Sequence, residues 1–454
     1  MAFTTVNPTT GKVEATFDQH TPAEVEALVE RAARTFLTYR RTTFAERVGW
    51  MRAAADLYDA EQPDIARVLT TEMGKTYAAA KAEVAKCALC MRWYADRAEG
   101  FLADTVVESA AGRSFIRYQP LGPVLAVMPW NFPLWQVMRF AAPALMAGNI
   151  GLLKHASNVP QSAILIEDVF RRAGFPQGAF STLLVPAGEV AGLIADDRIV
   201  AVTLTGSEGA GRSVGQAAGR ALKKCVLELG GSDPFLVLSS ADVDQAVKVA
   251  VTARVLNNGQ SCIAAKRFVV VDAVADRFIS RFVDAMAGLR VGDPLDPATD
   301  VGPLVSSDQR AEVASQVDDA RDKGAVVACG GAVVAGDGWF YQPTVLTGVT
   351  PDMRAHDEEV FGPVAIVEPV ADLDEAIAAA NRTTFGLGSS VWATAPDEQR
   401  RCIEEIEAGM VFVNSMVVST PELPFGGIKR SGYGRELAHL GILEFCNAKA
   451  VWVA

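Results

Sequence analysis

Cys262 is the residue of this chain whose type and setting most directly suggest covalent chemistry. It follows the short polar segment Asn257–Ser261, after a predicted helix and before a predicted strand. A thiolate at this point could attack an aldehyde carbonyl, and the adduct could expel hydride if the charge on its oxygen were stabilised. By itself the segment is weak evidence, because most buried cysteines are inert packing residues.

Glu228 and Asn131 could supply the base and the hydrogen-bond donor for such a reaction. Glu228 stands among apolar strand residues, where burial raises the pKa of a carboxyl group and makes it a usable base near neutrality. Asn131 lies between Pro129 and Pro133, which fix the backbone so that its side-chain amide can be held as a donor. Each also has a purely structural reading, as a paired buried carboxylate and as part of a proline-rich turn.

The composition limits the class of protein. The chain of 454 residues predicts two or three domains, and its net charge of −12 argues against a nucleic-acid partner. No apolar run approaches the roughly 20 residues that cross a membrane, and the N-terminus lacks the features of a signal peptide, so we expect a cytoplasmic protein. The seven cysteines are scattered, and the pair Cys87 and Cys90 has no further ligands nearby, so no metal is expected.

The hydrophobic pattern predicts an α/β organisation that can position these residues. Helical periodicity runs from Thr21 to about Ala103. Short apolar runs then alternate with helical stretches, first in strands such as Val124–Met128 and, after Glu228, in strands such as Arg267–Val271. Buried strands alternating with helices indicate parallel sheets, so we predict two α/β domains joined near Glu228.

Two strand ends offer groups to a dinucleotide. Lys154 ends a predicted strand, where open α/β sheets bind ligands, and it is followed by the hydroxyl of Ser157. Thr205–Ser207 ends another strand before a helix, which suits a pyrophosphate. The chain has no strict G-x-G-x-x-G after a strand, and the loose glycine pattern around Gly188 is a poor fingerprint by itself.

Taken together, the motifs resemble the aldehyde dehydrogenase superfamily from about Asn7 to the C-terminus. They occur in the order PWNFP, LLKHAS, LTGS, LELGG, NGQSC, EEVFGPV, FGL and PFGGIKRSGYGRE. The resemblance implies that Cys262 is the nucleophile and Glu228 the general base. It also implies that the Asn131 side chain and the backbone N–H of Cys262 form the oxyanion hole.

The resemblance also implies a set of cofactor contacts. Lys154 and Ser157 match positions at the adenosine ribose, Ser207 matches a pyrophosphate contact, and Glu359 and Phe361 match the grip on the nicotinamide ribose and ring. The whole set expected to bind the cofactor is Trp130, Lys154, His155, Ser157, Gly188, Thr205, Gly206, Ser207, Leu229, Glu359 and Phe361.

The fold implied is a Rossmann-type cofactor domain, an α/β catalytic domain and a small oligomerisation β-hairpin. On this sequence the cofactor domain would be residues 1–116 and 140–228, and the catalytic domain residues 229–428. The oligomerisation or bridging segments would be residues 117–139 and 429–454. We therefore expect a homodimer or homotetramer.

A narrower resemblance is to short bacterial succinate-semialdehyde dehydrogenases. It rests on the short N-terminus, on Lys154-His155, and on the segments KKCVLELGGSDPF and GRELAHLGILEFCN. It implies oxidation of a small aldehyde with a distal carboxylate, for which Arg139 is the expected partner through a bidentate contact. The alternative for Arg139 is a surface salt bridge. Further residues expected to shape the substrate pocket are Trp135, Ser261, Ser419 and Phe425.

Two positions depart from the common superfamily pattern. Ser157 stands where a glutamate is usual, and a hydroxyl can donate to a 2′-phosphate that a carboxylate would repel, so NADP is expected to be accepted and favoured over NAD. Ala264 stands two residues after Cys262, which excludes a redox disulfide at that spacing.

Other functions remain open from the sequence. They are the oxidation of another small aldehyde such as glutarate semialdehyde, a CoA-acylating dehydrogenase, and a non-catalytic binding protein on the same fold. Glu228 counts against the CoA-acylating enzyme, because no base for water would then be needed. The presence of Cys262, Glu228 and Asn131 together counts against a non-catalytic protein.

Overall fold

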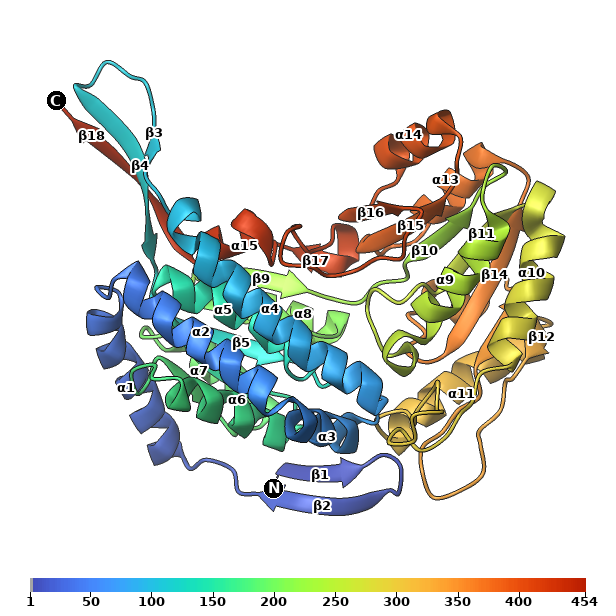
Figure 1. Ribbon diagram of the computed structural model, residues 1–454, viewed down its shortest axis with the longest axis horizontal. Coiled ribbons are helices and arrows are strands. Elements are labelled where there is room, and N and C mark those ends of the chain that lie inside the picture. The colour runs from blue at the N-terminus through green and yellow to red at the C-terminus, as the bar shows by residue number, and fades with distance from the viewer. Residues whose placement is uncertain (1–2) are drawn as a thin grey trace.

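A six-stranded sheet forms the centre of the first α/β unit of the computed structural model, which describes residues 3–454 (Figure 1). Its strand order is β17-β9-β8-β5-β6-β7, and only β17 runs antiparallel to its neighbour. The strands are β5 (Pro123–Met128), β6 (Ile150–His155), β7 (Phe180–Thr182), β8 (Ala201–Thr205), β9 (Lys224–Glu228) and β17 (Gly432–Tyr433). The central strands are almost wholly buried apolar runs, as parallel strands covered on both faces must be.

Helices cover both faces of this sheet. They are α1 (Pro22–Tyr39), α2 (Phe44–Ala60), α3 (Gln62–Met73), α4 (Tyr77–Phe101), α5 (Trp135–Ala147), α6 (Pro160–Arg172), η1 (Ala187–Glu189), α7 (Val190–Ala195), α8 (Glu208–Arg220) and α15 (Ala438–Leu443). The predicted start at Thr21 is confirmed by a capping box in which Thr21 and Glu24 each accept from the other's backbone N–H. Every residue of α5 is buried, so both its length and its direction are fixed by packing.

The second α/β unit contains a seven-stranded sheet of order β12-β13-β14-β11-β10-β15-β16, in which β12 alone is antiparallel among the described residues 3–454. The strands are β10 (Pro234–Val237), β11 (Arg267–Val271), β12 (Val326–Cys329), β13 (Thr344–Thr347), β14 (Val364–Val370), β15 (Gly388–Trp392) and β16 (Met410–Val413). The helical segments of this half are α9 (Val243–Val255), η2 (Leu256–Gly259), α10 (Asp272–Ala287), α11 (Ser307–Asp322), α12 (Arg354–Asp357), α13 (Leu373–Asn381), α14 (Pro396–Glu405) and η3 (Lys429–Ser431). The predicted α/β class with parallel sheets is confirmed.

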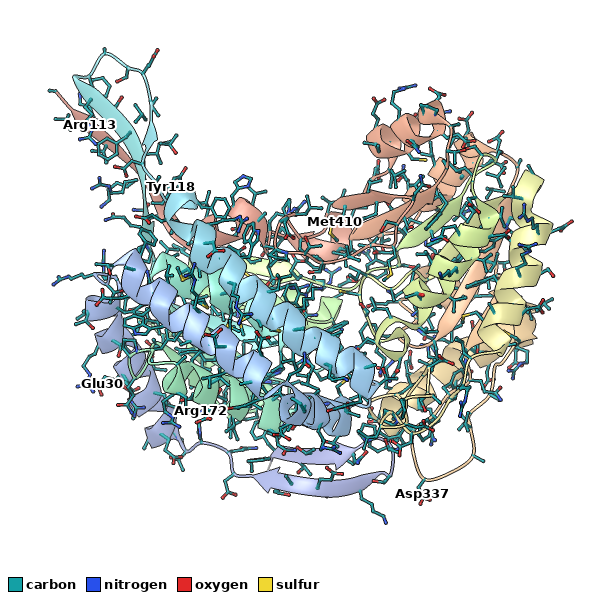
Figure 2. All side chains as sticks on the ribbon, viewed as in Figure 1. Glu30, Arg113, Tyr118, Arg172, Asp337 and Met410 are labelled. Carbon is teal, nitrogen blue, oxygen red and sulfur yellow. The ribbon has the colours of Figure 1, made fainter. Side chains whose placement is uncertain are left out.

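A three-stranded arm projects from the first unit (Figure 1). It has the order β18-β4-β3 and consists of β3 (Thr105–Val106), β4 (Arg113–Pro120) and β18 (Cys446–Val453). The pairing of β4 with β18 joins a segment near the first quarter of the chain to its C-terminus. Figure 2 shows Arg113 near the tip of the arm and Tyr118 near its base. A separate hairpin of β1 (Phe3–Asn7) and β2 (Lys12–Phe17) lies at the opposite side of the molecule (Figure 1).

The predicted hairpin segment 117–139 is wrong over much of its length. Only residues up to Pro120 belong to the arm, whereas Pro123–Met128 is β5 of the six-stranded sheet and Trp135–Ala147 is α5. The reason is visible in the burial pattern, because β4 is mostly exposed or partly exposed while β5 is almost entirely buried. A continuous apolar run belongs in a central strand, and an exposed arm cannot bury it.

Over residues 3–454, no helix has both the length and the hydrophobicity needed to cross a membrane.

Candidate active site

A cavity of about 250 Å³ lies at the carboxyl ends of β5, β8 and β9, where the two α/β units meet. This is the edge at which parallel sheets place their ligands. The cavity is lined by Pro129, Trp130, Asn131, Gln136, Thr205, Gly206, Ser207, Leu229, Gly230, Cys262, Gln309, Glu359 and Phe361. The structure therefore brings together nine of the predicted residues, namely Trp130, Asn131, Thr205, Gly206, Ser207, Leu229, Cys262, Glu359 and Phe361.

Arg254 fixes the loop that carries Cys262. Its fully buried guanidinium donates to the backbone carbonyls of Ala265, Gly259 and Gly362, at 2.8, 2.8 and 2.7 Å. Burial lowers the pKa of Arg254 to about 9, so the side chain still carries its charge at neutral pH. Hydrogen bonds from a charged donor are stronger than neutral ones, and here they tie the loop to a neighbouring backbone segment.

Lys266 holds the same loop from its other end. Its buried ammonium donates to the carbonyls of Ser261, Cys262 and Ala264 at 3.0, 2.8 and 3.1 Å. The same nitrogen lies 3.4 Å from a carboxylate oxygen of Glu359, which lines the cavity. One cation thus fixes the backbone of the nucleophile and orients a predicted cofactor ligand.

Asn131 is held against the nucleophile loop in the manner expected of an oxyanion donor. Its side-chain amide donates to the carbonyl of Gln260 at 3.1 Å, and Asn257 donates to the Asn131 carbonyl at 2.7 Å. A primary amide has two N–H bonds, so one remains to be shared with a ligand in the cavity that Asn131 and Cys262 both line.

A buried ion pair positions the turn that carries Asn131. The carboxylate of Glu83, on α4, accepts from the backbone N–H groups of Leu134 and Trp135, both at 2.9 Å, at the start of α5. Lys75 forms a fully buried ion pair with the same carboxylate. A negative charge suits the N-terminus of a helix, so the pair fixes the direction in which α5 leaves the Asn131 turn.

His155 is held by hydrogen bonds at both ring nitrogens, and its predicted contact with the cofactor stays a prediction. Its Nδ1 accepts from the backbone N–H of Ala156 at 2.9 Å, so its Nε2 carries the hydrogen and donates to the carbonyl of Pro133 at 2.8 Å. Burial lowers the pKa of His155 to about 4, which keeps the ring neutral. Both ring nitrogens are occupied, and His155 braces the Asn131 turn rather than lining the cavity.

One part of the cavity is lined by Glu359 and Phe361 from the second α/β unit and by Trp130 from the turn after β5. Glu359 accepts from the backbone N–H of Gly231 at 3.1 Å. The rings of Trp130 and Phe361 meet edge to face with centroids 5.7 Å apart, and Gln309 donates to the Phe361 carbonyl at 3.0 Å. An aromatic wall beside an anchored carboxylate suits a flat ring attached to a ribose, and the predicted contact of Glu359 and Phe361 with the nicotinamide ribose and ring stays a prediction.

The cavity is also lined by Thr205, Gly206 and Ser207, at the N-terminus of α8. Ser207 is the N-cap of this 13-residue helix, and its hydroxyl accepts from Ala210 N at 3.3 Å. A side chain added at Gly206 would meet nothing closer than 3.7 Å, so the backbone can be approached closely. This arrangement can hold a phosphate through backbone N–H groups.

Lys154, Ser157 and Gly188 lie outside the lining of this cavity. Lys154 is buried near the end of β6, and burial lowers its pKa. Ser157 follows β6 and is exposed, as is Gly188 in η1. Because β6 is the neighbour of β5, these groups follow the same edge of the sheet as the cavity and could meet the far end of an extended ligand.

Glu228 ends β9 and is 1% exposed, yet its side chain does not line the cavity. Neither carboxylate oxygen has a hydrogen-bond partner among residues 3–454. A Cβ at Gly426 would lie 2.7 Å from one of these oxygens, so the carboxylate fills the space that this glycine leaves. Burial, reinforced by the charge of Glu436, raises the pKa of Glu228 well above its usual range, and the acid form is favoured in this position.

Arg139 has an internal partner that the sequence did not predict. Its Nε lies 2.6 Å from a carboxylate oxygen of Glu436, and its guanidinium stacks 4.1 Å from the centre of the Phe425 ring. Only 2% of Arg139 is exposed, and it does not line the cavity. The structure therefore does not present Arg139 as a free cation, and its predicted contact with a substrate stays a prediction.

Ser419 contacts Trp135 and lines a cleft with Phe425, and all three residues were predicted to shape the substrate pocket. Trp135 donates from its indole nitrogen to the hydroxyl of Ser419 at 3.1 Å. Ser419 and Phe425 line a second cleft of about 200 Å³. Ser261 is fully buried beside Cys262, and its hydroxyl has no hydrogen-bond partner in the described part of the chain.

The sequence did not point to Gln136, Gln309 or Lys86. Gln136 and Gln309 line the main cavity, and Gln136 could have been suspected because it is in the first turn of α5, close after Asn131. Lys86, on α4, places its ammonium 4.2 Å from the centre of the Trp135 ring. No sequence motif surrounds Lys86, so only the packing of α4 on α5 brings it to attention.

Removal of Lys75 should show how strongly the Asn131 turn depends on its buried ion pair. Lys75→Met leaves the Glu83 carboxylate buried without a countercharge, and we expect a loss of about 3–5 kcal/mol in the free energy of unfolding, measured by urea denaturation. The double variant Lys75→Met/Glu83→Met removes both charges and should recover part of this loss. A single variant as stable as the native chain would contradict the assignment.

The chain is similar over its whole length to known proteins. The sequence model of the aldehyde dehydrogenase family matches residues 1–451. The chain is 60% identical over 457 aligned positions to succinate-semialdehyde dehydrogenase (NADP(+)) of Mycobacterium avium (strain 104), covering 100% of this chain and 97% of that protein. It is 59% identical to succinate-semialdehyde dehydrogenase (NADP(+)) 1 of Mycobacterium tuberculosis (strain ATCC 25618 / H37Rv), with 100% of both covered. The crystal structure of succinic semialdehyde dehydrogenase from Streptococcus pyogenes in complex with NADP+ superposes with a TM-score of 0.98 at 39% identity, over 100% of both chains.

Proposed function

This chain belongs to the aldehyde dehydrogenase family, and we propose that it oxidises succinate semialdehyde to succinate with NADP as the hydride acceptor. The observation that carries the proposal is the convergence of Cys262, Asn131 and Glu359 on one cavity in a chain similar over its whole length to NADP-dependent succinate-semialdehyde dehydrogenases. Glutarate semialdehyde and other small aldehydes are the competing substrates.

The test of this function is a steady-state panel that follows NADPH or NADH absorbance. Succinate semialdehyde, glutarate semialdehyde, butanal and benzaldehyde are each assayed with both cofactors, with and without CoA. We expect the highest kcat/KM for succinate semialdehyde with NADP, and no requirement for CoA. A higher value for butanal or benzaldehyde would overturn the substrate, and a requirement for CoA would overturn hydrolysis as the second step.

The residues of the cavity fit a nicotinamide dinucleotide. The open backbone at Gly206 before α8 suits the pyrophosphate, and the anchored Glu359 carboxylate beside Phe361 suits the ribose and ring. When bound, the oxidised nicotinamide accepts the hydride that leaves the substrate carbon. The residues of the chain itself bind the aldehyde, move the protons and stabilise the oxygen.

Cys262 must pass its proton to water or to Glu228 as it reacts, because burial raises the pKa of its thiol to about 12. Its sulfur forms a bond to the aldehyde carbon, and the carbonyl oxygen takes up negative charge that the free N–H of Asn131 can stabilise. Loss of hydride leaves a thioester, and attack by water then releases the carboxylic acid and restores the thiol.

We propose Glu228 as the base for water. In the observed position its carboxyl group lies against Gly426 and near Glu436, away from the cavity lining. Rotation of the side chain about its own torsions, with β9 unchanged, would bring it from this pocket toward the thioester. Leaving the charge of Glu436 for a water-containing cavity would lower its pKa and restore its basicity.

Glu228→Gln tests this role. The amide has nearly the same volume but cannot accept the proton of water, so we expect kcat to fall by about 10²–10⁴-fold while the first turnover persists. Rapid mixing should then show a burst of NADPH followed by slow turnover. The control Cys262→Ala should show no burst. Unchanged steady-state rates between about pH 6 and 9 would remove Glu228 from this step.

NADP preference is supported by the edge that follows β6. The exposed Ser157 hydroxyl can donate to a 2′-phosphate, and the buried Lys154 ammonium lies three residues earlier in the chain. Position 157 carries no carboxylate that would repel the phosphate, because its residue is a serine.

Ser157→Glu should shift the preference toward NAD. Like charges at short range in a partly exposed site cost about 1–4 kcal/mol, which corresponds to a loss of roughly ten-fold or more in kcat/KM for NADP. Ser157→Ala is the control, since it removes the hydroxyl without adding a charge and should lose less. If the glutamate variant uses NADP as well as the native enzyme does, Ser157 does not contact the phosphate.

We propose a homo-oligomer in which the arm of β3, β4 and β18 joins the subunits. The arm exposes large apolar side chains, with Trp452 61% and Val106 77% exposed, which a monomer would leave in water.

We also propose that the six-stranded sheet belongs to the cofactor domain and the seven-stranded sheet to the catalytic domain.

All seven cysteines are free, which supports a reducing compartment such as the cytoplasm.

Trp452→Asp should reduce the size of the assembly. A charge on the apolar face of β18 opposes burial against a second subunit, and sedimentation velocity should detect smaller species at micromolar concentration. Val13→Asp, on strand β2 far from the arm, likewise replaces an exposed apolar side chain by a charge and should lack this effect. An unchanged sedimentation coefficient for Trp452→Asp would place the interface elsewhere.

A further inference from the structure

A cleft at the base of the arm gathers four arginines in a chain whose net charge is −12. Its volume is about 560 Å³, which is within the range of small-molecule sites. The charged residues that line it are Arg40, Arg41, Arg47, Asp104 and Arg117, and we call it the arm-base cleft. None of its lining residues lines the cavity of Cys262, so the cleft is separate from the candidate active site.

Segments far apart in the chain supply these charges. Arg40 is the C-cap of α1, Arg41 follows it directly, and Arg47 is near the start of α2. Asp104 precedes β3, and Arg117 is on β4 of the arm. The cleft therefore lies where the connection from α1 to α2 meets the base of the arm (Figure 1).

Only one of the four arginines is balanced by a carboxylate. Arg117 donates to both oxygens of Asp104, at 3.0 and 2.7 Å. Arg40, Arg41 and Arg47 have no carboxylate oxygen within 4.0 Å among residues 3–454. The cleft thus holds three guanidinium charges without a paired anion.

Arg47 is the buried member of this set. It is 5% exposed, and its Nη1 donates to the carbonyl and hydroxyl oxygens of Thr42 at 3.1 and 3.3 Å. Its buried Nε has no hydrogen-bond partner within residues 3–454, and its Nη2 makes no hydrogen bond to them either. Since Nε carries one hydrogen and Nη2 carries two, three of the five N–H groups lack an acceptor.

The two titratable groups that act on Arg47 do not pair with it. Tyr39 is buried and donates its hydroxyl to the carbonyl of Leu145, and burial raises the pKa of Tyr39, so it stays neutral near pH 7. Glu46 caps the start of α2, where its carboxylate accepts from the backbone N–H and the hydroxyl of Thr43 at 2.7 and 2.8 Å. Burial lowers the pKa of Arg47, as expected for a cation removed from water without a paired carboxylate.

We propose that the arm-base cleft binds a small anion that carries two or more phosphate groups, such as pyrophosphate or the phosphate chain of a nucleotide. The planar guanidinium of arginine binds phosphate oxygens in pairs, and Arg47 has the unused N–H groups to do so. Arg40 and Arg41, exposed at the mouth of the cleft, would meet the remaining charge. A single carboxylate would balance only one of these three cations.

Isothermal titration calorimetry with pyrophosphate tests the site directly. The enzyme first takes up one NADPH per subunit, so that the cavity of Cys262 is already occupied. We expect one pyrophosphate to bind per subunit, more tightly than citrate and more weakly as the salt concentration rises. Absence of saturable binding at about 0.15 M ionic strength, or tighter binding of citrate, would refute the proposal.

The variant Arg40→Gln/Arg41→Gln removes the two exposed guanidiniums and leaves the core unchanged. The dissociation constant for pyrophosphate should rise by about ten-fold or more, because hydrogen bonds to charged groups are lost. Adenosine, which has the base and ribose of a nucleotide but no phosphate, should bind to neither protein in this cleft. ATP should follow pyrophosphate.

Arg67→Gln/Arg97→Gln is the matched control, since it removes the same net charge. The guanidinium of Arg67 faces the ring of Tyr77, and that of Arg97 faces the ring of Trp93. Both arginines are exposed, have no carboxylate oxygen within 4.0 Å among the described residues 3–454, and lie outside the lining of the cleft. This variant should bind pyrophosphate with close to the native affinity.

Arg47→Gln tests the buried contact by a second measurement. Pyrophosphate should raise the thermal midpoint of the native enzyme, because a ligand of the folded state stabilises it, and should not raise that of Arg47→Gln. An equal rise in both proteins would remove Arg47 from the site. If Arg47→Gln does not fold, the Arg40→Gln/Arg41→Gln variant decides the question.

The remaining outcomes are equally distinct. Release of NADPH by pyrophosphate, followed by NADPH fluorescence, would place the anion in the cavity of Cys262 and refute the arm-base cleft. Equal affinities of the native enzyme and Arg40→Gln/Arg41→Gln, or equal losses in that variant and the control, would also refute it. A loss confined to the cleft variants, with native kcat/KM for the aldehyde in the absence of pyrophosphate, supports it.

Discussion

The bonds from two buried cations to backbone carbonyls are the constraint on which the active site depends. Arg254 and Lys266 between them bind six carbonyl oxygens on and around the loop of Cys262. Carbonyls satisfied by charged donors leave the loop little freedom, so the thiol keeps its place without a regular helix or strand around it. Lys266 also approaches Glu359, which couples the position of the Cys262 loop to the part of the cavity proposed to hold the cofactor.

The first α/β unit meets this loop with an equally fixed surface. The Lys75–Glu83 pair sets the start of α5, His155 braces the preceding turn, and Asn131 reaches across to the carbonyl of Gln260. The oxyanion donor proposed here, Asn131, therefore comes from one unit and the proposed nucleophile, Cys262, from the other. The hydrogen bond from Asn131 to Gln260 ties the two sides of the cavity together, and a preorganised donor needs such support from both sides.

The sequence predicted the parts of this arrangement that depend on local pattern. Apolar runs gave the buried strands, and short motifs identified Cys262, Asn131 and Glu359. It could not predict contacts between segments far apart in the chain, such as the pairing of Arg139 with Glu436 or the approach of Lys86 to Trp135. The prediction of the arm was wrong although Pro120-Leu121-Gly122-Pro123 is a turn pattern, with Gly122 at φ 147°, that separates the exposed strand from the central one.

The guanidinium of Arg139 acts on two buried carboxyl groups, those of Glu436 and Glu228. Glu436 is paired with Arg139, whereas the Glu228 side chain stands near both and has no hydrogen-bond partner among residues 3–454. The Glu228 carboxyl group is consequently most stable in its protonated form. The base role proposed for Glu228 therefore requires it to leave this position, whereas the ion pair with Arg139 holds Glu436 in place.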